Sequence, residues 1–185
     1  MRKDLGNKMN FLPLPVLMIG TYDENGNANV MNAAWGGMAD YNKIMVCMSN
    51  HKTTENIGIN KEFTISIGDA DHVVECDYVG IVSANKDPKK MDKSGFTTRK
   101  AEFVNAPIIN ELPLCIECRL DKIVEEDLYI AEIINVNADE KILDEKGNIC
   151  LDKFTPISYD PSTHGYYKVQ GRVGHAFKDG RKKDR

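Results

Sequence analysis

The chain has 185 residues, and 24 lysines and arginines against 28 aspartates and glutamates give a formal net charge of −4. That length suits one domain, and the composition, 42% apolar and 28% charged, excludes a disordered or collagen-like chain. The mild acidity argues against nucleic acid or an anionic membrane as the main partner. We therefore expect one domain over residues 1–185, with a core of about 13–177 and a flexible tail at 178–185.

The sequence favours the cytoplasm over secretion or a membrane. No apolar leader follows Met1, and the most apolar run, 11–20, is about half of the roughly 20 residues that a membrane-spanning helix needs. The five cysteines are odd in number and irregularly spaced, which is typical of reduced thiols rather than of a disulfide framework.

Strand and turn signals open the chain. Val16–Tyr22 and Asn27–Trp35 flank the turn sequence Asp23-Glu24-Asn25-Gly26 and predict a hairpin. Ile44–Met48 is a continuous apolar run, which predicts a strand buried on both faces. Phe63–Ile67 alternates with period two, so we expect one of its faces to meet solvent.

Short helices and a long hairpin complete the predicted fold. Thr54–Asn60 predicts a helix capped by the Thr53 hydroxyl, and Asp71–Val82 has apolar residues at helical spacing. The stretch 85–100 indicates a surface excursion, whereas 114–124 and 128–137 predict two long strands. Many strands with few helices favour a mainly β fold, a closed or nearly closed barrel, over a parallel α/β sheet.

A Cys-x-x-Cys pair at Cys115 and Cys118 lies inside one of these predicted strands. Residues three apart in a strand point to opposite faces, so the two sulfurs should not share a metal or a disulfide. The four histidines show no ligand spacing, and we predict no metal site. Cys76, on the second predicted helix, is a better candidate for a redox thiol than this pair, but the favoured interpretation is a buried, inert thiol.

The stretch Ser49-Asn50-His51-Lys52-Thr53-Thr54 connects a buried strand to a short helix. A helix N-terminus presents free N–H groups and partial positive charge, so it is suited to phosphate. Hydroxyls and the Lys52 ammonium would add donors. The alternative is that Thr53 only caps the helix and that Lys52 is only solvated.

The stretch from Asn29 to Gly37 is unusual for a strand, because small residues precede one tryptophan and two glycines. Such a strand allows a flat partner to approach the backbone closely. Taken alone, the stretch is better explained by a barrel strand packed against a neighbour, in which Trp35 fills a gap in the core.

Five segments in the same order resemble the flavin reductase-like family with the FMN-binding split barrel, in its flavoredoxin-type branch. They are Asn32-Ala33-Ala34-Trp35, Ser49 to Ile57, Asp77 to Ser83, Lys93 to Thr97, and Val104 to Pro107 with Ile109. The resemblance runs from about Pro13 to Phe177 and implies a mainly β, Greek-key split barrel with a few short helices.

The resemblance also implies a homodimer that binds FMN in a groove between subunits. The stretch matching Asn32, Ala33, Ala34 and Trp35 would line the isoalloxazine ring. The stretch matching Ser49, Asn50, His51, Lys52, Thr53 and Thr54 would hold the phosphate. Ser83 and Lys90 match positions that approach the flavin, although Lys89-Lys90-Met91 replaces the acid-lysine-aromatic run of relatives.

FMN itself would supply the redox chemistry, so the sequence assigns no catalytic acid, base or nucleophile. The resemblance implies transfer of hydride or electrons from NAD(P)H or a redox partner protein, as in an NAD(P)H:flavin reductase. Two alternatives stay open: a non-catalytic flavin electron carrier, and a sensor module that binds flavin or haem.

Overall fold

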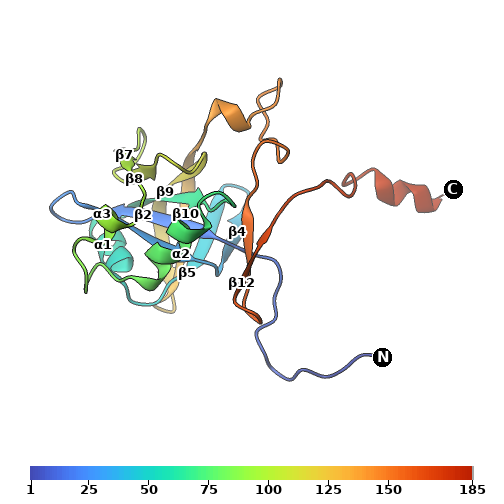
Figure 1. Cartoon of the computed structure of the whole chain (residues 1–185), viewed down its shortest axis with the longest axis horizontal. Helices are drawn as coiled ribbons and strands as arrows, with labels where there is room; N and C mark the ends of the chain where they lie inside the picture. The colour runs from blue at the N-terminus through green and yellow to red at the C-terminus, as the bar shows by residue number, and fades with distance from the viewer. Residues whose placement is uncertain (185) are drawn as a thin grey trace.

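A computed structural model describes residues 1–184 (Figure 1). Its main sheet orders seven antiparallel strands as β3-β2-β6-β9-β10-β5-β4. These strands are β2 Leu17–Tyr22, β3 Ala28–Ala33, β4 Gly36–Asp40, β5 Lys43–Cys47, β6 Glu62–Ile67, β9 Leu114–Val124 and β10 Leu128–Ala138. A smaller sheet orders β1-β11-β12, and β7 pairs with β8.

The remaining elements are short. The strands of the smaller sheet and the β7–β8 pair are β1 Leu14–Pro15, β11 Ile157–Asp160, β12 Gly165–Lys168, β7 Thr98–Lys100 and β8 Pro107–Ile109. The helices described in residues 1–184 are α1 Lys52–Asn60, α2 Val73–Ile81, α3 Lys90–Lys93, and the 3-10 helices η1 Glu140–Ile142 and η2 Asp179–Asp184. The structure is mainly β, which confirms the predicted fold class.

The sheet curls because its two edge strands are neighbours in sequence. β3 and β4 lie at opposite edges, yet only Ala34 and Trp35 connect them. A flat sheet of this size is about 29 Å across, whereas the connection reaches about 11 Å at most. Packing confirms the closure, since a Cβ on Gly36 of β4 would come within 2.6 Å of Leu17 Cδ1 on β2. Residues 34–35 therefore lie at the seam of a split barrel.

Three buried clusters fill the body. The first lies inside the barrel and includes Phe63 and Cys118. The second packs the other face of β2 and β3 against α2 and includes Met18 and Cys76. The third lies beneath residues 101–108 and includes Cys115. β2 contributes side chains to the first two clusters, which explains why its apolar run is continuous.

Two strand predictions are wrong in opposite directions. Ile44 and Val46 of β5 are buried, but Met45 is 38% exposed, so one face of this strand is open. In β6 the polar face is buried instead: Thr64 and Ser66 are both at most 1% exposed. The Thr64 hydroxyl donates a hydrogen bond to the carbonyl of Pro107 in the segment that covers it, so burial leaves this group satisfied.

Local predictions also need correction at the helices. α1 begins at Lys52 with His51 as its N-cap, so the prediction that Thr53 caps it is wrong. The stretch 85–100 is not only a surface excursion, because it contains α3 and β7 and buries Lys90, Ser94 and Phe96.

The chain ends extend away from the body as two arms (Figure 1). The strands end with β12 at Lys168, earlier than the expected core boundary near residue 177. The following arm is exposed at Val173 and Phe177 and ends in the short helix η2, where the sequence predicts only a frayed tail. Asp179 Oδ2 accepts a hydrogen bond from the His175 amide at 2.7 Å, at the start of this turn.

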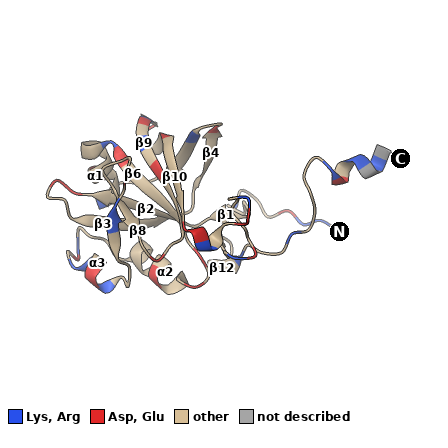
Figure 2. Ribbon diagram, turned by 90° about the horizontal axis from the view of Figure 1, so that it is seen from above, with Lys and Arg blue, Asp and Glu red and all other residues tan. Residues whose placement is uncertain are grey.

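Charged side chains of both signs are scattered over the body rather than gathered on one face (Figure 2). In the described part of the chain, no helix has the length and apolar character to cross a membrane.

Candidate functional site

Two adjoining cavities open where β3, α1 and α2 meet. The wide cavity has a volume of about 600 Å³ and the narrow cavity about 170 Å³. They share the walls formed by Met31, Asn32, His51, Gly80 and Ile81. The two cavities are therefore adjoining parts of one groove.

The narrow cavity lies at the N-terminus of α1. Lys52 and Thr53 line it from the first turn of the helix, and Asn29 lines it from β3. Thr53 Oγ1 accepts a hydrogen bond from Asn29 Nδ2 at 2.8 Å, which leaves the threonine proton available to a ligand. Lys52 Nζ is 3.7 Å from Glu55 Oε2, and both side chains are partly exposed. The helix terminus thus offers a hydroxyl and a cation to an anion.

Lys90 of α3 adds a second, buried cation. Its side chain lines the narrow cavity, only 3% of the residue is exposed, and no hydrogen bond or ion pair occupies it among residues 1–184. Burial without a partner lowers the pKa of this ammonium to about 8. A buried amine that lines a cavity and has no counter-ion is suited to bind an anion. The bound anion would offset the free energy that desolvation of the amine costs.

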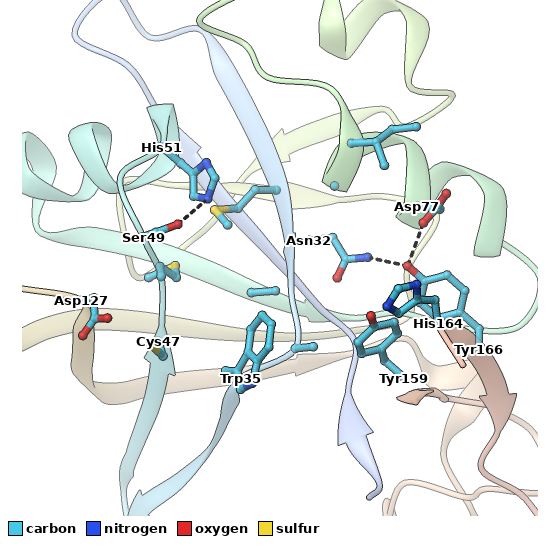
Figure 3. Close-up of a pocket in the computed structure, with 16 residues that line it drawn as sticks. Asn32, Trp35, Cys47, Ser49, His51, Asp77, Asp127, Tyr159, His164 and Tyr166 are labelled. Carbon is cyan, nitrogen blue, oxygen red and sulfur yellow. Dashed lines mark hydrogen bonds between the residues drawn. The ribbon is translucent and has the colours of Figure 1, made fainter. Parts of the chain in front are cut away.

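The loop before α1 is held by its own hydrogen bonds. The Thr54 hydroxyl accepts from the His51 amide at 2.8 Å and donates to the His51 carbonyl at 2.8 Å. Ser49 Oγ lies 3.1 Å from His51 Nε2 (Figure 3). Thr54 therefore fixes the loop, while Ser49 and His51 reach the cavity wall.

The wide cavity lies over the barrel seam. Ala33, Ala34 and Trp35 line it at the connection between β3 and β4, and Gly80 and Ile81 line it from α2. A Cβ on Gly80 would lie 3.0 Å from Asn32 Cβ, so the glycine lets α2 approach β3 closely. Small residues and an exposed indole form a wall against which a flat ring system can lie.

The β11–β12 hairpin forms the opposite side of the wide cavity with Tyr159, His164 and Tyr166 (Figure 3). The rings of Tyr159 and His164 stack at 6.4 Å between centroids with 9° between planes. His164 has a φ of 58°, a left-handed conformation that the turn requires. Asp160 fixes this turn by accepting hydrogen bonds from the side chains of Ser162 and Thr163.

One hydrogen-bonded cluster joins the three elements around the wide cavity. Asn32 Nδ2 donates to the Cys76 carbonyl at 3.0 Å and to Tyr166 Oη at 3.4 Å. The Tyr166 hydroxyl donates to Asp77 Oδ1 at 2.9 Å. Burial and the hydrogen bond to Asp77 both raise the pKa of Tyr166 well above its ordinary value, so the phenol stays protonated.

The cysteines lie outside this chemistry, with one exception at the rim. Cys115 and Cys118 belong to different buried clusters, as the opposite faces of a strand require. Burial raises the pKa of Cys115 to about 11 and that of Cys76 to about 12, which makes both thiols inert. Cys47 lines the wide cavity, as does Asp127. Burial raises the pKa of the Cys47 thiol, and the Asp127 carboxylate raises it further.

Most of the predicted site residues line the groove. Asn32, Ala33, Ala34, Trp35 and Ser49 line the wide cavity, Lys52, Thr53, Ser83 and Lys90 line the narrow one, and Asn32 and His51 line both. Two do not line it: Asn50 is exposed, and Thr54 turns its hydroxyl to the loop backbone. Among the side chains that the structure describes, no group of three metal-ligating residues gathers.

Sequence reasoning missed the residues that come from distant segments. These are Asn29 in the narrow cavity and Asp77, Asp127, Tyr159, His164 and Tyr166 in the wide one. Asp77 lies within a segment that carries the family resemblance, so that segment was a usable signal. The hairpin residues carry no local pattern that points to a site.

The class of protein follows from this groove and from the sequence of the whole body. A sequence model of the flavin reductase like domain matches residues 9–162, so the chain belongs to that family. The groove fits a flavin, since it offers a seam lined by small residues and one indole beside a cavity with an unpartnered buried amine. The β12 residues that contribute Tyr166 follow the matched segment.

Solved structures specify the branch. Flavoredoxin of Desulfovibrio vulgaris (Miyazaki F) is 33% identical over 97% of this chain and 100% of that chain, with a TM-score of 0.93. Flavoredoxin from Methanosarcina acetivorans is 28% identical over 98% of each chain, with a TM-score of 0.87. An FMN-binding domain of a flavin reductases-like enzyme from Shewanella baltica, 22% identical over 87% of this chain and 88% of that chain, has a TM-score of 0.79 and shows the fold alone. The flavoredoxin-type branch and the split barrel are thus confirmed.

Proposed function

We propose that the chain is an FMN-binding oxidoreductase that passes hydride or electrons from NAD(P)H or a redox partner protein through its flavin. The observation that carries this proposal is the buried Lys90 amine in a narrow cavity beside the wide cavity over the seam. FMN has this shape and charge: a flat ring at one end and a phosphate at the other.

The narrow cavity would hold the phosphate. Lys90 and Lys52 supply charge, and Thr53 and the free N–H groups of the first turn of α1 supply donors. Ser83 lines the same cavity and adds a hydroxyl. Since the Lys90 ammonium has a pKa of about 8, it is mostly charged at neutral pH and available to a phosphate.

The wide cavity would hold the ring. Bound FMN supplies the redox chemistry, because its ring takes up a hydride and returns electrons singly or in pairs. The residues of the chain bind and orient the ring: Ala34 and Trp35 lie along the seam, and Ile81 lies on the α2 side. The cavity also has room and an aromatic wall for a second molecule, through Tyr159 and His164.

The first experiment measures binding by purified protein of FMN and of riboflavin, which has the same ring and no phosphate. We expect flavin bands in the visible spectrum and much tighter binding of FMN, because each hydrogen bond to a charged group contributes about 1.5–3 kcal/mol. Equal affinity for the two ligands would contradict the assignment of the narrow cavity. A haem spectrum would favour the sensor alternative.

A second measurement separates a reductase from a carrier. A reductase oxidises NADH or NADPH in the steady state when flavin is present, whereas a carrier accepts electrons only from a partner protein. We propose the reductase, supported by family membership and by the space beside the ring site. Failure of both nucleotides to be oxidised, with FMN bound, would favour the carrier.

We also propose a homodimer in the cytoplasm. Trp35, Met38 and Met45 lie on or beside the two strands at the seam and are 49%, 57% and 38% exposed, which is the kind of apolar surface that a second copy covers. All five cysteines are free, as expected of a reducing compartment. Sedimentation at micromolar concentration should give the mass of two chains, and a mass near one chain would contradict the dimer.

A further inference from the structure

The side chain of Asn32 has a fixed orientation in the wide cavity. The Cys76 carbonyl can only accept a hydrogen bond, so the amide nitrogen of Asn32, at 3.0 Å, must face it. The Asn32 carbonyl oxygen therefore points the other way. Figure 3 shows that oxygen turned away from Tyr166, toward the side of the cavity where Trp35 lies.

Hydrogen bonds that involve Tyr166 and Asp77 also hold Asn32 in this orientation. Tyr166 donates its proton to Asp77 Oδ1 at 2.9 Å, so its oxygen is left to accept, and it accepts from the second N–H of Asn32 at 3.4 Å. Both protons of the Asn32 amide are then engaged with the protein. Within residues 1–184, no hydrogen bond occupies the Asn32 carbonyl oxygen, which lies at the cavity wall.

We propose that Tyr166 and Asp77 are positioning residues that hold Asn32 so that its carbonyl oxygen accepts a hydrogen bond from a ring N–H of the bound flavin. This inference rests on the proposed function. It assigns a role to β12, which lies beyond the matched family segment, and it gives Asn32 a side-chain function as an acceptor rather than a donor. The chain of bonds runs from α2 through β12 to β3.

Two N–H groups of a flavin fit this acceptor, and they behave differently on reduction. The N3–H is present in oxidised and reduced rings alike, so an acceptor for it binds both equally. The N5–H exists only after reduction, so an acceptor for it stabilises the reduced ring and raises the midpoint potential. Both arrangements use the same chemistry at Asn32, and one set of variants distinguishes them.

The test compares Tyr166→Phe and Asn32→Ala with wild type in the FMN-loaded protein. We expect each variant to weaken binding by about twofold to tenfold, the range for one neutral hydrogen bond. If N3–H is the donor, wild type prefers FMN over its N3-methyl analogue, both variants lose that preference, and the midpoint potential stays unchanged. If N5–H is the donor, only reduced FMN binds less tightly, and the midpoint potential falls by about 9 to 30 mV, the two-electron equivalent of that loss.

Tyr167→Phe is the matched control, because it removes a hydroxyl from the next residue of the same strand. Tyr167 is 54% exposed, lies outside both cavities, and should leave affinity, preference and potential unchanged. Asn32→Ala keeps the test decisive if Tyr166→Phe folds poorly, since it removes the acceptor itself.

The positioning role is overturned if FMN binds to wild type and Tyr166→Phe changes neither the N3-methyl preference nor the midpoint potential. A preference for FMN over the N3-methyl analogue that survives in both variants, with the midpoint potential unchanged, reflects the size of the methyl group and also counts against the proposal. Absence of FMN binding by wild type is a different result, because it overturns the proposed function and the positioning role with it.

Discussion

The two cavities of the groove are built in different ways. The narrow cavity takes the Lys52 ammonium and the Thr53 hydroxyl from neighbouring residues at the start of α1, and its other walls from β3, the end of α2 and the segment that follows α2 as far as Lys90. The wide cavity takes its walls from β3, the end of β5, α2 and the β11–β12 hairpin, which are far apart in the sequence. One cavity presents charge and free donors, and the other presents flat and small side chains.

Under the proposed function, this difference would let the phosphate and the ring of FMN be recognised separately. A helix N-terminus carries its donors wherever it forms, so an anion site needs only a short stretch of sequence and one or two cations. A ring needs surfaces on more than one side, and a short segment cannot supply them. The predictions below test whether phosphate and ring recognition are separable, from the largest expected effect to the smallest.

Removal of both cations should give the largest difference between the effect on FMN affinity and the effect on riboflavin affinity. Lys52→Ala combined with Lys90→Met should weaken FMN binding by at least about 100-fold, because two charge-assisted interactions are lost. Riboflavin binding should change little, since that ligand has no phosphate. Quenching of flavin fluorescence at fixed ionic strength measures both affinities.

Trp35→Ala is the opposite variant, because Trp35 lines the wide cavity and not the narrow one. This variant should weaken the binding of FMN and of riboflavin by the same factor. Equal losses for both ligands in the lysine double variant would show that the phosphate lies elsewhere. Thr54→Ala is a poor probe, since its hydroxyl holds the loop backbone rather than facing the cavity.

Affinity for FMN should fall as pH rises above about 8, the pKa of Lys90 without ligand. A bound phosphate favours the ammonium and raises that pKa, so between the two values binding takes up a proton. The affinity then decreases by up to about tenfold per pH unit. Titrations of FMN and riboflavin from pH 7 to 10 measure the slope, and riboflavin corrects for ionisation of the ring.

Lys90→Met should remove most of this slope while lowering the affinity at neutral pH. A slope of equal size in the variant would assign the titration to another group. The pKa of Lys90 also determines how stability depends on pH. The lysine keeps its proton to higher pH in the unfolded chain than in the folded one. The free energy of unfolding of the ligand-free protein should therefore increase with pH between about 8 and 10.5, the ordinary pKa of a lysine.

Substitution of the Cys-x-x-Cys pair should have the smallest effect on flavin affinity. Cys115→Ser combined with Cys118→Ser should leave FMN affinity and redox activity nearly unchanged, because both thiols lie in buried clusters outside the two cavities. Thermal unfolding should show that the free energy of unfolding falls by about 1–3 kcal/mol for each buried serine hydroxyl that lacks a hydrogen-bond partner. Loss of activity in a folded double variant would mean that the pair is functional.

The sequence by itself determined the strands, the turn at 23–26 and the hydroxyl-bearing and cationic start of α1. These features depend on residues close together: period-two apolar patterns, a turn sequence, and hydroxyl and cationic residues before a helix. The order of five family-like segments also determined the split barrel. The seam at Ala34 and Trp35 follows in part, because its small residues and tryptophan mark the stretch as unusual before the fold explains why.

Only the tertiary structure decided which faces are buried and which distant groups meet. Thr64 and Ser66 read as a solvent face until residues 101–109 cover them, and Met45 reads as core until the edge of the sheet leaves it open. The family resemblance singled out Lys90, but only the packing of α3 shows that this lysine is buried. Tyr166 reaches Asn32 only because the small sheet folds beside α2, since hydrogen bonds between residues more than a hundred positions apart have no local pattern in the sequence.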